Sequence, residues 1–223
     1  MNPGKLLTGT RSRRSTTAAT RTVFGWYTAA IVVLCAGCSN VLAPRPDTTR
    51  FFILSAVAAG PNVAASGSAA ATAVGLGPIS FPQYLARNEM VTRTADNRIQ
   101  FSARNRWAEP LDITFRRVLA EDLSRALGGA SVTEFPFFGA APPFTMRVQV
   151  TINRFETDSR GTAHLSALWN VIEVANNRVL YATSSEIEVA GAAGAAARAA
   201  TLSQAAAQFA YQIAAELVSL ERR

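Results

Sequence analysis

The chain has few of the side chains that most often carry chemistry. Its 223 residues include two cysteines and one histidine. A zinc site needs a cluster of Cys, His or carboxylate ligands, and a Ser-His-Asp triad would have to use the single histidine, His164. His164 stands between Ala163 and Leu165 in an alternating strand pattern, which favours an ordinary sheet histidine. We therefore expect no metal, no cofactor and no catalytic residue.

Acidic residues are absent from the first 22 positions, which carry a group of basic residues, Lys5, Arg11, Arg13, Arg14 and Arg21. An apolar stretch follows over residues 23–35, and Ala36 and Gly37 then precede Cys38. A basic segment, a short apolar segment and small residues before a cleavage point are typical of a secretory signal. The apolar stretch is shorter than the roughly 20 residues that a membrane span needs.

The small pair Ala36-Gly37 directly before Cys38 resembles the lipobox of bacterial lipoproteins, although Cys35 stands where that motif usually has Leu. The resemblance implies cleavage between Gly37 and Cys38 and lipidation of Cys38. An uncleaved signal anchor is the alternative. Both interpretations leave the rest of the chain on the same side of the membrane, because the basic flank stays cytoplasmic.

The formal charge of +7 does not indicate a nucleic-acid partner. Five of the 22 basic residues lie in the signal, so 17 basic and 15 acidic residues remain from Cys38 onward, a net charge of +2. No basic stripe suited to phosphate binding stands out. Loss of Cys35 with the signal and acylation of Cys38 leave no thiol for a disulfide in the body of the protein.

Three regions follow: a signal peptide over 1–37, a lipidated tether over 38–49, and one domain over 50–223, which is long enough to bury a core. Periodicity predicts, in chain order, strands at 50–55, 72–79, 89–94 and 98–102, a helix at 110–127, strands at 144–152, 163–171 and 178–189, and a C-terminal helix over 202–220. Residues 56–71 are expected to form a loop. We expect an α+β fold: a two-layer domain with a largely antiparallel sheet and two main helices on one face.

Finer expectations concern individual side chains. Pro110 suits the first position of the first helix, and Arg117 and Glu121 are spaced to pair on its outer face. In the strand that begins at Phe144, strict alternation predicts that Phe144 and Met146 share the buried face.

Two carboxylate pairs have the residue types of acid–base chemistry. Glu121 and Asp122 are adjacent on a helix, so their side chains should point apart. Glu186 and Glu188 share one face of a strand, and the apolar Ile187 indicates that this face is the solvent face. We expect neither pair to be catalytic.

The segment 104–111, Arg-Asn-Arg-Trp-Ala-Glu-Pro-Leu, is the most distinctive in the domain. Under a structural interpretation, Trp107 fills the place where the hairpin meets the helix and Glu109 acts at the helix start. Under a functional interpretation, Arg106, Trp107, Glu109 and Pro110 form a contact surface for a partner, because Trp and Arg are favoured at interface hot spots. Both interpretations stay open.

A family resemblance rests on several runs taken in order. They are the lipobox cysteine, RFFILS at 50–55, VGLGPI at 74–79, FPQYLAR at 81–87, MVTR at 90–93 and NRWAEPL at 105–111. Together they resemble the PqiC/YmbA-like family, the auxiliary lipoproteins of MCE-type transport systems. The resemblance covers the chain from Cys38 to the C-terminal helix, with departures at Cys35 and in the Ala/Gly/Ser-rich insertion over 56–71.

The resemblance implies a non-enzymatic, lipid-anchored periplasmic subunit that docks or stabilises an intermembrane lipid-transport machine and supports membrane integrity. Its implied partners are an MCE-domain protein with associated membrane subunits, and self-association is left open. Ser39, in place of the Asp that resembles an inner-membrane retention signal, favours the outer membrane, facing the periplasm. The alternative is a periplasmic lipid-anchored hydrolase or carbohydrate-active lipoprotein, which the small stock of reactive residues disfavours.

Replacement of the lipobox cysteine tests the signal. We expect Cys38→Ser to leave an unprocessed precursor, because the thiol that receives the lipid is gone. Mass spectrometry of the membrane-extracted parent should find a lipidated N-terminus at Cys38. An unlipidated mature chain that begins elsewhere would refute the expectation.

Overall fold

One sheet and two long helices make up the part of the chain that the structure describes, a computed structural model covering residues 46–57, 73–135 and 143–223. The expected signal peptide, Cys38 and most of the expected loop over 56–71 lie outside the described residues. The strands are β1 (Arg50–Phe52), β2 (Val74–Ser80), β3 (Glu89–Ala95), β4 (Arg98–Trp107), β5 (Val132–Glu134), β6 (Met146–Asp158), β7 (Ala163–Glu173) and β8 (Arg178–Val189). The helices are the short 3-10 helix η2 (Gln83–Leu85), α2 (Leu111–Ala126) and α3 (Ala195–Glu221).

Strand β6 is the partner of three other strands. It pairs with β7 in antiparallel fashion along its length, and β8 follows β7. On its other edge, β6 pairs with β2 in parallel over Met146–Thr151, and with β3 in parallel only at Thr157 and Asp158. The remaining strands continue the sheet from β2 and from β3. Strand β5 pairs with β2, β4 pairs with β3, and β1 pairs with β4.

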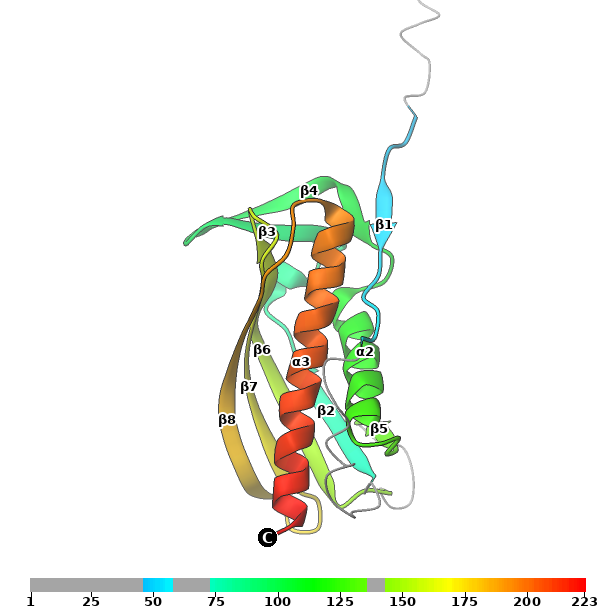
Figure 1. Ribbon diagram of the computed structural model, residues 1–223, viewed down its shortest axis with the longest axis vertical. Helices are drawn as coiled ribbons and strands as arrows, with labels where there is room; N and C mark the ends of the chain where they lie inside the picture. The colour runs from blue at the N-terminus through cyan, green and yellow to red at the C-terminus, as the bar shows by residue number, and fades with distance from the viewer. Residues whose placement is uncertain (1–45, 58–72, 136–142) are drawn as a thin grey trace, which may run out of the picture. The chain divides into compact units, whose positions relative to one another are not determined.

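The expected α+β architecture is confirmed. The antiparallel ladders β6–β7–β8 and the β3–β4 hairpin make up most of the pairing, and both helices lie on one face of the sheet (Figure 1). Four strand pairings are parallel: β1–β4, β2–β5, β2–β6 and β3–β6. Side-chain alternation reports which face a residue occupies and not the direction of the neighbouring strand, so these pairings and the three-residue β5 were not predicted.

The core lies between the sheet and the two helices. Helix α2 contributes the expected apolar stripe, with Phe115, Val118, Leu119 and Leu123 all fully buried. The Phe115 ring stands edge-on to Phe81 and to Phe155, with centroids 5.2 and 4.9 Å apart. On α3 the buried positions include several alanines, Ala205, Ala206, Ala210 and Ala214. Small side chains allow α3 to lie close to its neighbours.

Two expectations about α2 were wrong. Pro110 is the N-cap and not the first helical residue. Arg117 pairs with Glu109 at 3.1 Å, and Glu121 pairs with Arg125 at 2.8 Å, so the expected Arg117–Glu121 pair does not form. The Glu121–Arg125 order is the favourable one, because a helix prefers the acidic residue four positions before the basic one. Arg125 also contacts Asp122 at 3.0 Å, and the Glu121 side chain is exposed whereas that of Asp122 is buried, so the two carboxylates point apart as expected.

Phe144 also departs from its predicted face. Gly75 is paired with Arg147, whose neighbours Met146 and Val148 point into the core. A Cβ added at Gly75 would collide with the Phe144 ring, so this ring lies on the sheet face opposite the helices. Phe144 precedes the first residue of β6, and alternation is not enforced outside the strand. Glycine at position 75 leaves the space that the ring occupies.

The segment after β1 lies along the two helices. Leu54 is buried in the core, and the Ser55 N–H donates to the Ser203 hydroxyl of α3 at 3.1 Å. The Val57 N–H donates to Asp122 Oδ1 of α2 at 2.8 Å. Burial raises the pKa of Asp122 to about 6, although the Val57 amide and Arg125 act to lower it.

This carboxyl makes stability depend on pH. The folded chain holds the proton up to about pH 6, whereas the ordinary pKa is 3.8, so the folded state binds more protons between these two values. The contribution of Asp122 to the free energy of unfolding therefore falls as the pH rises from about 4 to about 6. We expect Asp122→Asn to remove this slope, because the amide oxygen still accepts from Val57 and cannot ionise. Urea titrations across this pH range measure it, with the exposed Glu188→Gln as a control that should keep the slope of the parent.

Candidate functional site

The distinctive segment of the sequence forms the junction of β1, β4 and α2. The Trp107 N–H donates to the Asn88 carbonyl at 2.6 Å, and the Ala108 N–H donates to the Phe52 carbonyl of β1 at 2.8 Å. The Trp107 side chain is 4% exposed and belongs to the main core. The structural interpretation of Trp107 thus matches its position, and its ring is not available to a partner.

The neighbours of Trp107 face solvent. Arg106 is exposed and its guanidinium lies 3.9 Å from Glu89 of β3. Glu109 accepts the hydroxyl of Thr114 at 3.0 Å and the guanidinium of Arg117 at 3.1 Å. These two contacts lower the pKa of Glu109. A buried Trp therefore holds a surface on which Arg106, Glu109 and Pro110 are exposed.

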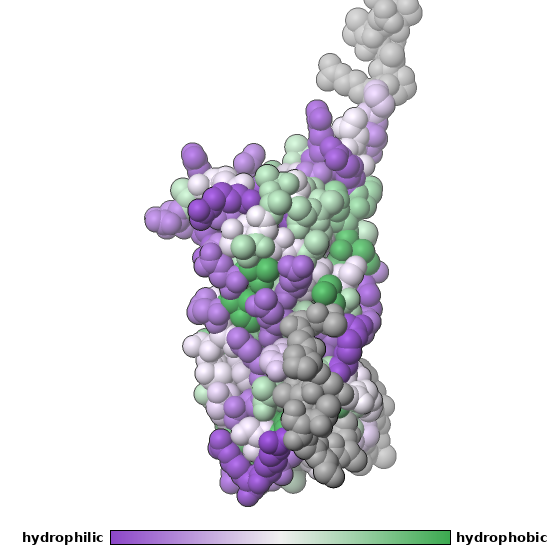
Figure 2. Space-filling view, viewed as in Figure 1, coloured by the Kyte–Doolittle hydropathy of each residue, from purple (hydrophilic) through white to green (hydrophobic). Residues whose placement is uncertain are grey.

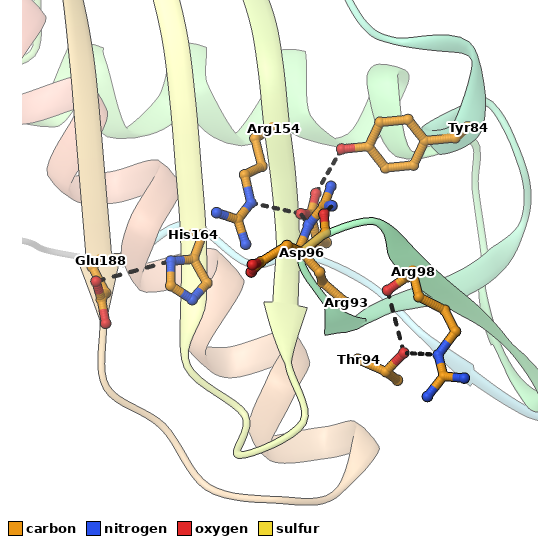
Figure 3. Close-up of polar contacts among 9 residues, drawn as sticks. Tyr84, Arg93, Thr94, Asp96, Arg98, Arg154, His164 and Glu188 are labelled. Atoms are coloured by element: carbon orange, nitrogen blue, oxygen red, sulfur yellow. Dashed lines mark hydrogen bonds and ion pairs between the residues drawn. The ribbon is translucent and has the colours of Figure 1, made fainter.

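A buried carboxylate lies where the hairpin meets β6. Glu156 is 1% exposed. Its Oε1 accepts from Arg93 of β3 and from Arg154 of β6, each at 2.7 Å, and its Oε2 accepts the Tyr84 hydroxyl of η2 at 2.6 Å. Figure 3 shows Tyr84, Arg93 and Arg154 arriving at one point from three different elements.

The electrostatics of this cluster keep Glu156 charged. Burial alone would raise the pKa of Glu156, but hydrogen bonds from Tyr84, Arg93 and Arg154 outweigh it and lower the pKa. Burial, together with the hydrogen bond to the carboxylate, raises the pKa of Tyr84. A carboxylate held by three donors is suited to fastening elements together and not to exchanging protons.

The cluster supplements a short strand contact. The hairpin reaches β6 only through Thr92 and Arg93 of β3. Arg93 also donates to the Asp96 carbonyl in the hairpin turn at 2.8 Å, so it links the turn to Glu156. From the other side, Arg198 of α3 donates to the Thr92 hydroxyl at 2.8 Å.

This cluster was not predicted, because the alternating pattern of residues 144–152 ends at Ile152 whereas β6 continues to Asp158. The β6–β7 register shifts between Ile152 and Arg154. Such a bulge breaks the alternation, and the phase beyond it cannot be continued from the residues before it. The one available signal was Phe155, three residues after Ile152, which marks a new phase for the strand.

The other candidate residues stay on the surface of the sheet. His164 Nδ1 lies 3.9 Å from Glu188, and Glu188 is 68% exposed. Glu186 accepts the hydroxyl of Ser166 and is also exposed, as expected. Over 46–57, 73–135 and 143–223, no group of three potential metal-binding side chains comes together. Within the same ranges, no helix has the length and apolar character needed to cross a membrane.

A hollow of about 330 Å³ lies on the sheet, with a lining that includes Gln149, Thr151, Leu168 and Asn170. Among the residues that the structure describes, no titratable side chain lines it. It therefore offers contacts by shape and by neutral hydrogen bonds.

Comparison with known proteins gives a family match over most of this fold. Residues 52–214 match the family described as "ABC-type transport auxiliary lipoprotein component". The proteins named intermembrane transport lipoprotein PqiC from Escherichia coli (strain K12) and from Shigella flexneri are each 32% identical to this chain over 91 residues. That segment covers 41% of this chain and 46% of each relative, so less than half of each relative is matched.

Solved structures share the fold. An uncharacterized protein superposes with a TM-score of 0.62 at 23% identity, covering 76% of this chain and 98% of the other. Protein XCC0632 from Xanthomonas campestris superposes with a TM-score of 0.63 at 14% identity, covering 78% and 97% of the two chains. At these identities, the likeness concerns the fold alone.

Removal of the buried Trp107 ring should destabilise the domain. A buried Trp→Ala change typically costs about 3–5 kcal/mol of unfolding free energy. For a domain of this size, that cost lowers the thermal midpoint by roughly 6–20 °C. Phe51→Ala, which truncates an exposed aromatic, is the matched control and should shift the midpoint little. An unchanged midpoint for Trp107→Ala would contradict the assigned burial.

Neutralisation of Glu156 should loosen the hairpin. Glu156→Gln keeps the shape but removes the charge that two arginines contact, which costs about 1.5–3 kcal/mol, as for hydrogen bonds to charged groups. Chemical denaturation measures this loss, and hydrogen exchange should become faster in β3 and β4. The exposed Glu188→Gln is the control, with an expected change within about 0.5 kcal/mol. Equal stability of Glu156→Gln and the parent would show that the cluster does not fasten the hairpin.

Proposed function

The chain belongs to the family of ABC-type transport auxiliary lipoprotein components, and we propose that it is a non-enzymatic, lipid-anchored subunit of an MCE-type intermembrane transport system. The observation that carries this proposal is the family match over residues 52–214, which runs from the last residue of β1 to the last turns of α3. The intermembrane transport named for the two PqiC relatives supports the choice of system.

The anchor is proposed from the sequence. A signal peptide over 1–37 delivers the chain to the periplasm, cleavage after Gly37 exposes Cys38, and lipidation of Cys38 fixes the chain to a bilayer. Ser39 favours the outer membrane, with the domain facing the periplasm. Several acyl chains give stable anchoring, since each buried methylene contributes about 0.8 kcal/mol.

The domain then serves as a docking part for an MCE-domain protein and its membrane subunits, and so supports membrane integrity. The surface at Glu109 and Pro110, which follow β4, is the candidate contact for that partner. It is exposed, and the backbone N–H groups of Trp107 and Ala108 beside it donate to Asn88, just before β3, and to Phe52 of β1. A contact surface on a rigid support loses less entropy on binding than a mobile one.

Isolation of the native chain from membranes tests this function. A tagged chain extracted in mild detergent should retain an MCE-domain protein, and membrane fractionation should recover it with the outer membrane. Glu109→Arg should reduce retention of the partner, while Glu188→Arg, at an exposed glutamate of β8, should not. Retention of no transport subunit, or recovery in the inner membrane, would count against the corresponding part of the proposal.

The hydrolase alternative predicts that the only histidine, His164, is essential for function. A Ser-His-Asp enzyme loses its activity when the histidine is replaced, whereas an adaptor does not depend on it. We expect His164→Ala to support membrane integrity as well as the parent does. Loss of function in a normally folded His164→Ala chain would favour the enzyme.

A further inference from the structure

The edge of the domain that follows the tether combines apolar and basic side chains. In β1, Phe51 is 64% exposed, and Ile53 just beyond the strand is 43% exposed. Exposed large apolar residues that sit close together mark a surface that contacts something else. Figure 2 shows purple, hydrophilic side chains around the end of the molecule where β1 lies, with green, hydrophobic surface directly below them.

Arginines stand beside these apolar residues. The β1–β4 register places Arg106 directly opposite Phe51, and Arg104 lies two residues earlier on β4. Both arginines are exposed. Arg106 has one acidic neighbour, Glu89, at the long distance of 3.9 Å, and Arg104 has no ion pair with any acidic residue in the described ranges. The face therefore has cationic groups free to contact an anion.

We propose that this face, defined by Phe51, Ile53, Arg104 and Arg106 and called the β1 face, binds the surface of an anionic phospholipid bilayer. Guanidinium groups form paired hydrogen bonds with phosphate oxygens. Aromatic and aliphatic side chains enter the boundary between headgroups and acyl chains. The inference rests on the proposed lipidation of Cys38, which brings the domain to a bilayer.

Chain length places the β1 face close to the anchor. Thirteen residues lead from Cys38 to Phe51, and at about 3.5 Å each they reach at most about 45 Å. Strand β1 is the first element of the described domain. Strand β1 is therefore the element of the described domain that lies nearest to Cys38 along the chain.

The size of the β1 face also favours a bilayer over a protein. A stable protein interface buries roughly 800 Å² on each partner. Strand β1 has three residues, and two exposed apolar side chains at this strand offer a smaller area than that. A bilayer contact needs less area when a lipid anchor already holds the domain at the membrane. The contact of the β1 face is then intramolecular, and the high effective concentration of the bilayer favours it. The apolar pair orients the domain, and the arginines select an anionic surface.

A tryptophan introduced at Phe51 can report on this contact. The signal peptide carries Trp26 away, and the remaining Trp107 and Trp169 are 4% and 5% exposed. Phe51→Trp in the full-length, lipidated protein is reconstituted into phosphatidylglycerol-containing vesicles with brominated acyl chains, which quench fluorescence by contact. The matched control is Val179→Trp, at a position that is 54% exposed and paired with Ile172, at the end of the sheet where β6 begins.

We expect Phe51→Trp to be quenched several-fold more strongly than Val179→Trp in the same vesicles. Phosphatidylcholine vesicles, or Arg104→Glu added to Phe51→Trp, should lower the quenching, whereas added Arg178→Glu should not. Equal quenching at positions 51 and 179 overturns the inference. Shielding of the introduced tryptophan that depends on protein concentration without lipid also overturns it, because that result would indicate a second copy. Ile53→Trp is the substitute if Phe51→Trp does not fold, as judged by its thermal midpoint.

Failure of the anchor can be told apart from failure of the β1 face. If Cys38 is not lipidated, neither variant associates stably with vesicles, and mass spectrometry of the N-terminus shows the missing lipid. If the chain is lipidated and bound but Phe51→Trp shows no quenching, the proposed function stands and the β1 face does not contact lipid.

Discussion

The thirteen residues of β6 hold the two parts of the sheet together. One edge of β6 is fully used by β7, while its other edge is shared by β2 at the start and β3 at the end. Residues 152–156 lie between the segment of β6 that pairs with β2 and the segment that pairs with β3, and they pair with neither strand. The buried Glu156 lies in this interval. Tyr84 of η2, the helix that follows β2, reaches Glu156 there. The β3–β4 hairpin, and β1 paired with β4, join the rest of the sheet through this attachment.

Much of this architecture could be predicted from the sequence. A strand with one solvent-exposed face and one buried face requires polar and apolar residues to alternate. The ladder from β6 to β8 is an example: Val148, Val150, Leu165 and Ala167 are buried as expected. The limits come from information that periodicity does not hold. Strand direction is invisible to it, and the bulge after Ile152 shifts its phase. Phe144 shows the same limit just before a strand begins, where its ring crosses to the other face over Gly75.

One part of the candidate site could be predicted from the sequence and the other could not. Trp107 could be placed at a junction because it stands between a hairpin pattern and a helix start. Glu156 could not, because Tyr84 and Arg93 are 72 and 63 residues away from it in sequence. A glutamate between an apolar residue and a threonine looks like any strand carboxylate facing solvent. Only the fold brings two guanidinium groups and a phenol to it, and these contacts make burial of the charge tolerable.

The contact between Ser55 and Ser203 joins residues 148 positions apart. The hydrogen bond from Ser55 therefore cannot form before α3 has reached the end of β1. Contacts of such long sequence separation slow folding, since the closure entropy of the intervening chain is lost before they form.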